Sequence, residues 1–341
     1  MNTVILALMH FLVDLICAWA MFGRFRGGDS WYLDLLVYNF CAFALQMPLG
    51  TLLDLLRSRA DEKMRPYLPL LWTGLGVLLT AAGTRIHPAV LGLGNALFHV
   101  GGGMDVILED FAKGKRGRDL GLFVAPGAIG LYLGTCIARG GPDPWVLITP
   151  VVLTVVLFWR RRQEPSERAA TVPQTGGNAL LVSLCCFAVV ILRSWVGMSV
   201  SFSWKTGAVW PWLAVAAVAL GKLSGGLLSA RFGIQRTVAV SLLLAAACYI
   251  LGEIPGFGLT ALVLFNMSMP VTLYLLAENL HELPGFSFGL LTFGLFLGFL
   301  PVYAGVELPV SGSFFSTAAS VASLLLLTLA ERAVRHGNKI T

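Results

Sequence analysis

The stretch LGLFVAPGAIGLYLG, residues 120–134, has a counterpart in PGFSFGLLTFGLFLG, residues 284–298. Glycines and leucines at positions 121, 130, 131, 133 and 134 fall on identical residues at 285, 294, 295, 297 and 298. Small residues at four-residue spacing let transmembrane helices approach closely. We interpret the match as an internal repeat, with one copy in each half of the chain.

A polar interval separates the two copies. RRRQEPSERAATVPQTGGN, residues 160–178, is the longest polar stretch of the sequence and has the composition of a linker. We therefore predict an amino-terminal six-helix bundle over residues 1–160, a cytoplasmic linker over 161–177 and a carboxyl-terminal six-helix bundle over 178–341.

The composition requires a membrane. Hydrophobic residues make up 57% of the 341 and charged residues 12%, and the mean hydropathy is +0.79, so most helices cannot face water. A membrane span needs about 20 apolar residues. Twelve such stretches predict an all-α integral membrane protein: 3–22, 32–56, 67–84, 88–107, 119–138, 143–160, 178–200, 208–230, 234–252, 257–277, 285–306 and 310–330.

Basic residues set the predicted orientation. Most of the 24 Lys and Arg lie in loops on one side, which the positive-inside rule assigns to the cytoplasm. Both termini are then cytoplasmic, and we expect a multi-pass protein of a bacterial inner membrane. This asymmetry accounts for the net charge of +6, so we expect membrane lipid and no nucleic acid as a partner. The first span lacks a basic leader and a cleavage site, which favours a retained helix over a signal peptide.

Two loops carry a resemblance to a known family. GTLLDLLRSR, residues 50–59, has Gly50, Asp54 and Arg57, and GGLLSARFGIQR, residues 225–236, has Gly226, Arg231, Gly233 and Arg236. Gly-x-x-x-Asp followed by basic residues resembles the loop 2–3 signature of the major facilitator superfamily, although Ala230 stands where the second copy would place its acid. The resemblance implies two six-helix bundles that rock around a cavity lined by spans 1, 4, 7 and 10. It also assigns these residues a gating role.

Polar residues within the first-half spans are the leading site candidates, because charge inside a membrane is costly. His10 and Asp14 are four residues apart and share a helix face; we interpret them as a proton-coupling pair, or as a fixed ion pair that closes a gate. Asn95 and His99 have the same spacing and predict a substrate contact. The glycines at 101–103 indicate either a hinge or a close backbone approach to a ligand.

A narrower resemblance involves the same residues. ALFHVGG, residues 96–102, His10-x-x-x-Asp14 and Phe123-x-x-x-Gly127-x-x-Gly130-x-x-x-Gly134 resemble the fosmidomycin-resistance branch of efflux carriers. Val100 and Gly101 replace the Pro-Glu of that branch. The resemblance implies export.

The second half supplies further candidates. Arg193 in the seventh span either pairs with Asp14, holds an anionic group of a substrate, or faces lipid. Asn266, Pro270, Tyr274 and Glu278 follow at four-residue intervals in the tenth span, which predicts one polar stripe with a kink at Pro270. We expect Asn266 and Tyr274 to contact substrate.

These residues predict a secondary transporter that moves a small organic solute by alternating access, and we expect proton-coupled export. We expect a monomer with no cofactor and no metal. An uptake carrier for an anionic metabolite is one alternative. The others are a membrane-embedded lipid-modifying enzyme, with Asp105, Glu109 and His99 on a metal, and a non-transporting receptor.

Overall fold

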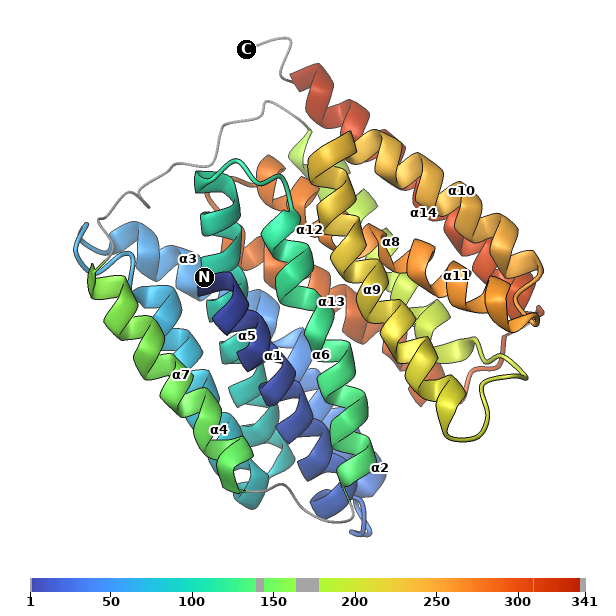
Figure 1. Ribbon diagram of the computed structural model, residues 1–341. Helices are drawn as coiled ribbons and strands as arrows, with labels where there is room; N and C mark the ends of the chain where they lie inside the picture. Colours follow the sequence, from blue (N-terminus) through green and yellow to red (C-terminus); the bar gives the residue numbers. More distant parts are fainter. Residues whose placement is uncertain (1, 139–143, 164–177, 309, 338–341) are drawn as a thin grey trace. The chain divides into compact units, whose positions relative to one another are not determined.

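The computed structural model describes residues 2–138, 144–163, 178–308 and 310–337, and the described chain is helical throughout (Figure 1). Helices are the expected form, because backbone groups in hydrocarbon must be satisfied within the segment. The elements are α1 (Asn2–Trp19), η1 (Ala20–Phe25), α2 (Trp31–Asn39), η2 (Phe40–Ala44), α3 (Gln46–Arg59), α4 (Leu68–Ile86), α5 (Pro88–Ala112), α6 (Arg118–Ile137), α7 (Pro144–Gln163), α8 (Ala179–Ser199), α9 (Val209–Phe232), α10 (Ile234–Ile250), α11 (Pro255–Asn266), α12 (Ser268–Asn279), α13 (Pro284–Tyr303) and α14 (Gly312–Gly337). Each of the twelve predicted spans corresponds to one helix or to one series of abutting elements, which confirms the predicted fold class.

Three spans are made of more than one element. A π-helical turn, η1, ends the first span, and another, η2, interrupts the second. The tenth span breaks at Met267, between α11 and α12. We predicted the kink at Pro270; the break lies three residues earlier because a proline ring clashes with the carbonyl of the residue four positions before it, here Asn266.

Among the described residues, nine helices are long and apolar enough to cross a membrane, counting abutting elements as one. The helix Ile234–Ile250 is apolar but shorter. Large hydrophobic side chains are exposed along these helices, including Leu52, Leu75, Leu184 and Leu325. An exposed apolar surface of this kind suits a bilayer and not water.

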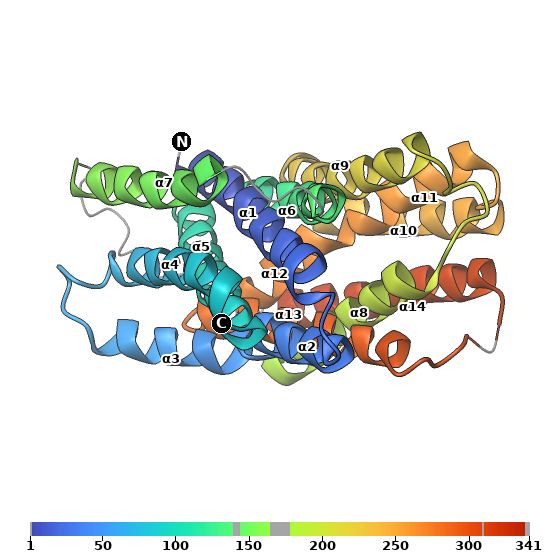
Figure 2. The ribbon, with the colours of Figure 1, turned by 90° about the horizontal axis from the view of Figure 1, so that it is seen from below.

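The chain forms two compact units. The first comprises Met1–Gly114, Leu122–Thr171 and Glu282–Phe293, and the second comprises Lys115–Gly121, Val172–His281 and Gly294–Thr341. Within the second unit α9, α10 and α11 pack together (Figure 2). Most of the predicted linker, residues 164–177, lies outside the described residues, and α7 runs on to Gln163. The predicted boundary between the halves stays a prediction.

Glycines bring α4 and α5 into backbone contact. A Cβ on Gly76 of α4 would lie 2.2 Å from the backbone nitrogen of Phe98, and one on Gly94 of α5 would lie 2.3 Å from that of Thr80. Gly101 meets α4 in the same way, 2.5 Å from the Pro69 carbonyl oxygen. The helix α5 is continuous through residues 101–103, and Gly101 lies against the α4 backbone. A hinge at these glycines, or their close approach to a ligand, stays a prediction.

The repeated glycines of α6 and α13 occupy equivalent contacts. Gly134 packs on the backbone of α1, where a Cβ would lie 2.3 Å from the Leu15 carbonyl oxygen. Gly298 packs on α8, with a Cβ placed 2.6 Å from the Ile191 carbonyl oxygen. The fifth span of each half therefore packs on the first span of the same half, as an internal repeat requires.

We predict that Gly76→Ala destabilises the protein while Gly197→Ala does not. The added methyl at Gly76 forces apart α4 and α5, and such overpacking costs roughly 1–3 kcal/mol. Gly197 in α8 has no atom within 4 Å of a built Cβ, so alanine there gains helix propensity at no steric cost. Thermal unfolding of both variants in detergent measures the difference. Equal midpoints would contradict the proposed contact.

Candidate functional site

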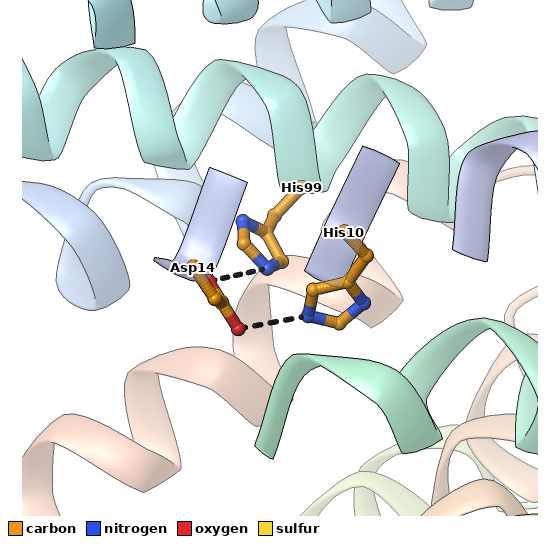
Figure 3. A group of neighbouring side chains, drawn as sticks. All are labelled: His10, Asp14 and His99. Carbon is orange, nitrogen blue, oxygen red and sulfur yellow. Dashed lines mark ion pairs between the residues drawn. The ribbon is translucent and has the colours of Figure 1, made fainter. Parts of the chain in front are cut away.

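Three titratable side chains converge inside the first unit (Figure 3). His10 and Asp14 come from α1, and His99 comes from α5. The Nε2 atom of His10 lies 3.2 Å from Oδ2 of Asp14, and the Nε2 atom of His99 lies 3.6 Å from Oδ1 of the same carboxylate. We call these residues the His-Asp-His cluster. The structure thus joins the two pairs predicted separately from the first and fourth spans.

The backbone fixes the tautomer of each imidazole. Nδ1 of His10 lies 2.8 Å from the Phe123 carbonyl oxygen, and Nδ1 of His99 lies 2.9 Å from the Asn95 carbonyl oxygen. A carbonyl oxygen only accepts hydrogen bonds, so Nδ1 is the donor in both rings. A neutral imidazole then directs the lone pair of Nε2 toward Asp14. Two such acceptors against a carboxylate are stable only when a proton or a cation lies between them.

Asn95 completes the polar site. Its Nδ2 donates to Oδ1 of Asp14 at 3.3 Å and lies 3.5 Å from Sγ of Cys17. Its Oδ1 is buried and has no hydrogen-bond partner among the described residues. The cluster and Asn95 therefore present mainly acceptor atoms, which favours a positively charged occupant.

Glycine in α6 makes room for the cluster. A Cβ on Gly127 would lie 2.3 Å from Nε2 of His10 and 2.5 Å from Oδ2 of Asp14. Gly127, Phe123 and Cys17 were not among the predicted site residues. The signal for two of them was the pattern Phe123-x-x-x-Gly127, because only a glycine lets the α6 backbone reach the carboxylate.

The cluster is shielded from solvent. His10 is 6% exposed and His99 8% exposed, whereas the Asp14 side chain keeps 19%. The His10 ring packs edge-on against His99, with centroids 4.5 Å apart, and also contacts Phe123. Asp14 lies about 18 Å along the first span from Asn2, close to the middle of a ~30 Å hydrocarbon core. Charges in such surroundings interact strongly.

The predicted site residues of the second half lie in the second unit. Arg193 of α8 is 7% exposed, and its Nη1 has no hydrogen-bond partner among the described residues. Asn266 donates to the carbonyl oxygen of Leu262 in its own helix, and the Tyr274 hydroxyl donates to Glu278 at 3.2 Å. The break at Met267 interrupts the single stripe that we predicted for this span. A pairing of Arg193 with Asp14 stays a prediction.

The loop signature is built differently in its two copies. Asp54 accepts hydrogen bonds from the backbone nitrogens of Gly285 and Phe286 at 2.9 and 2.7 Å, at the first turn of α13, where a carboxylate complements the helix dipole. A Cβ on Gly50 would lie 2.1 Å from the Gly285 carbonyl oxygen. In this first copy the Asp54 carboxylate therefore links the end of α3 to the start of α13. Arg57, one turn beyond Asp54, is partly buried.

The second copy has the glycine contact without the acid. A Cβ on Gly226 would lie 2.6 Å from the Gly117 carbonyl oxygen. Gly233 has a φ of 85° and ends α9, a conformation that glycine adopts without strain. Arg231 and Arg236 are exposed, and the Arg231 guanidinium lies over the Phe232 ring.

Asp105 and Glu109 do not join a metal site with His99. Asp105 is bound by Nη2 of Arg161 at 2.6 and 2.8 Å, and Glu109 pairs with Lys113. Within the described part of the chain, the group that could hold a metal is the His-Asp-His cluster. The ligand set considered for a lipid-modifying enzyme is therefore wrong.

Comparison with solved structures identifies the architecture. The E. coli fucose:proton symporter FucP matches over 96% of this chain and 96% of its own, with a TM-score of 0.62 and 14% identity. A second structure of FucP, described as a major facilitator superfamily transporter in the outward conformation, matches over 94% and 98% with a TM-score of 0.57 and 13% identity. The chain has the fold of the major facilitator superfamily.

The human organic anion transporter TETRAN has the same fold, with a TM-score of 0.62, 15% identity and coverage of 96% of this chain and 99% of its own. No protein-family profile matches the sequence, and no curated protein matches it either. At these identities the matched structures show the fold of the chain.

We predict that Arg161→Ala lowers the free energy of unfolding by about 3–5 kcal/mol, because it leaves the Asp105 carboxylate buried without its cation. Replacing both partners, as Arg161→Met with Asp105→Leu, costs much less, since no unpaired charge remains. Thermal unfolding in detergent, with the exposed Arg162→Ala as control, measures these differences. A double variant no more stable than Arg161→Ala would contradict this reading.

Proposed function

We propose that the protein is a secondary transporter that moves a small organic solute by alternating access, driven by a cation held at the His-Asp-His cluster. The observation that carries the proposal is the convergence of two imidazole Nε2 atoms on one carboxylate in the middle of a membrane span. A polar arrangement of this kind is costly in a membrane and marks ion or substrate pathways. The fold supplies the two helical bundles that such a mechanism uses.

The proton is the coupling cation that we propose, with His10 and Asp14 as the pair that carries it. Coupling requires the cation and the solute to favour different conformations of the transporter. A proton between Asp14 and an imidazole removes the repulsion between acceptors, so occupied and empty sites prefer different packing of α1, α5 and α6. Asn95 and His99 would contact solute in this half, and Arg193, Asn266 and Tyr274 in the other. Export remains our preferred direction through the resemblance to the fosmidomycin-resistance branch.

The loop residues serve gating in this proposal. Asp54 holds the first turn of α13 through two backbone hydrogen bonds, and Gly50 allows the contact. Breaking these bonds would free the cytoplasmic end of α3 during the transport cycle. The gating role that we propose extends to the other residues of the paired loops, which are Arg57, Gly226, Arg231, Gly233 and Arg236. The protein would act as a monomer in a bacterial inner membrane, with both termini cytoplasmic.

One observation favours a second candidate, uptake of an anionic metabolite. The buried Arg193 guanidinium has an Nη1 without a hydrogen-bond partner in the described chain, and a buried charge of this kind calls for an anion. The organic-anion arm of the assay below tests it. Arg193→Gln should then abolish anion transport and leave other solutes unaffected.

We predict that Asp14→Asn abolishes solute-dependent proton movement. Purified protein in liposomes with a trapped pH-sensitive dye would be given a panel of amphiphilic drugs and organic anions, with the pH gradient imposed in each direction. Asp29→Asn, in an exposed loop, is the matched control and should behave as wild type. The asparagine removes the charge that holds the cation while preserving side-chain size.

Three results would reject parts of the proposal. Coupled proton flux that survives Asp14→Asn would remove the cluster from the coupling mechanism. Solute that equilibrates without proton movement would identify a uniporter or another coupling ion. A wild-type protein that moves no solute across a broad panel would favour the receptor alternative.

A further inference from the structure

We propose that His10, Asp14 and His99 form a binding site for a divalent transition metal ion of the Zn²⁺ or Co²⁺ type. This inference goes beyond solute transport and does not depend on it. It also revises our expectation from the sequence, which included no metal. Three features support a metal site: the chemistry of the donor atoms, their spacing, and the groups that hold each ligand in place.

The donor set is two imidazoles and one carboxylate. Neutral imidazole nitrogen suits zinc, copper, iron and nickel, whereas Mg²⁺ and Ca²⁺ prefer oxygen ligands. Two histidines and one carboxylate form a recurrent three-ligand set that leaves positions open for water or another ligand. The chemistry therefore selects a transition metal over the common alkaline-earth ions.

The spacing fits one ion. Ligand atoms from the three residues all lie within 4.8 Å of one another. A metal about 2.0–2.1 Å from each donor places neighbouring donors about 3.3 Å apart in a tetrahedral site. Nε2 of His10 lies 3.2 Å from one Asp14 oxygen and Nε2 of His99 lies 3.6 Å from the other, both close to that value. Small side-chain rotations would complete the coordination (Figure 3).

The surrounding groups orient the ligands as metal sites require. A metal-binding histidine almost always donates its second ring N–H to a carbonyl or carboxylate, which fixes the tautomer and aims the free nitrogen at the metal. Here the Phe123 and Asn95 carbonyl oxygens accept from the two Nδ1 atoms. The Asn95 amide likewise supports Asp14. All three ligands thus have an outer partner.

The charge balance also favours a divalent ion. When the imidazoles are neutral with Nδ1 as donor, each of the two contacts between Nε2 and the carboxylate brings two acceptors together. One divalent ion replaces both repulsions with coordination bonds and offsets the buried negative charge of Asp14. The glycine at position 127 leaves no methyl group in the way on the α6 side. A metal ion and a coupling proton would then compete for the same atoms.

Direct metal binding tests the inference without any transport assay. Tag-free protein in detergent would be titrated with Co²⁺, whose visible absorption reports its coordination geometry, and then challenged with Zn²⁺ and Ca²⁺. We expect one Co²⁺ per chain, displaced by Zn²⁺ and not by Ca²⁺. His10→Ala, His99→Ala and Asp14→Asn should each weaken binding more than Asn95→Ala, which should cost roughly 10–100-fold as an outer partner. His87→Ala removes an exposed histidine and should leave the affinity for Co²⁺ unchanged.

A second measurement guards against variants that do not fold. X-ray absorption at the zinc edge of the loaded wild-type protein should show two imidazole ligands together with oxygen. A wild-type protein without a bound-cobalt spectrum, a zinc site with oxygen ligands alone, or equal loss of binding in His87→Ala would each overturn the proposal. None of these readouts involves solute movement. A negative result for metal binding therefore does not reject the transport proposal, and a negative result for transport does not reject the metal site.

Discussion

In the hydrocarbon core of a membrane there is no water to satisfy a polar group, and the rest of this structure depends on that constraint. Every span is helical because a helix satisfies its own backbone. Polar side chains within spans repeatedly bond to their own helix, as Thr73 does to Pro69 and Gln46 does to Ala42. Against this background, polar side chains that also meet across different helices are informative. The His-Asp-His cluster is such a group.

Glycine determines how the helices meet. With no hydrophobic force between helices in lipid, association relies on close van der Waals packing, and the glycines of α4, α5, α6 and α13 allow backbones to touch. The same residue type creates the site, because Gly127 lets α6 pass directly beside His10 and Asp14. Glycine therefore serves both the packing of the helices and the construction of the site. A side chain at position 127 would harm both.

The two halves repeat in architecture but not in chemistry. Gly134 and Gly298 occupy matching contacts on α1 and α8. In contrast, Asp54 holds the start of α13, while the corresponding acid is missing at Ala230. The buried acceptor site lies in the first unit, and the second unit contributes a buried arginine instead.

Hydropathy and helical periodicity are local properties of the chain, so the sequence predicted the twelve spans and the internal repeat. It also predicted that His10 and Asp14 share one helix face, and that Asn95 and His99 share another. It located the tenth-span break only approximately, since the clash falls on the residue four positions before Pro270. The joining of the two pairs was decided by tertiary structure alone. Asp14 and His99 meet through the packing of α1 against α5, and the carbonyl oxygens that orient both imidazoles have no signature in the sequence. The three side chains meet because α1 packs against α5, and Gly127 lets the α6 backbone lie beside His10 and Asp14.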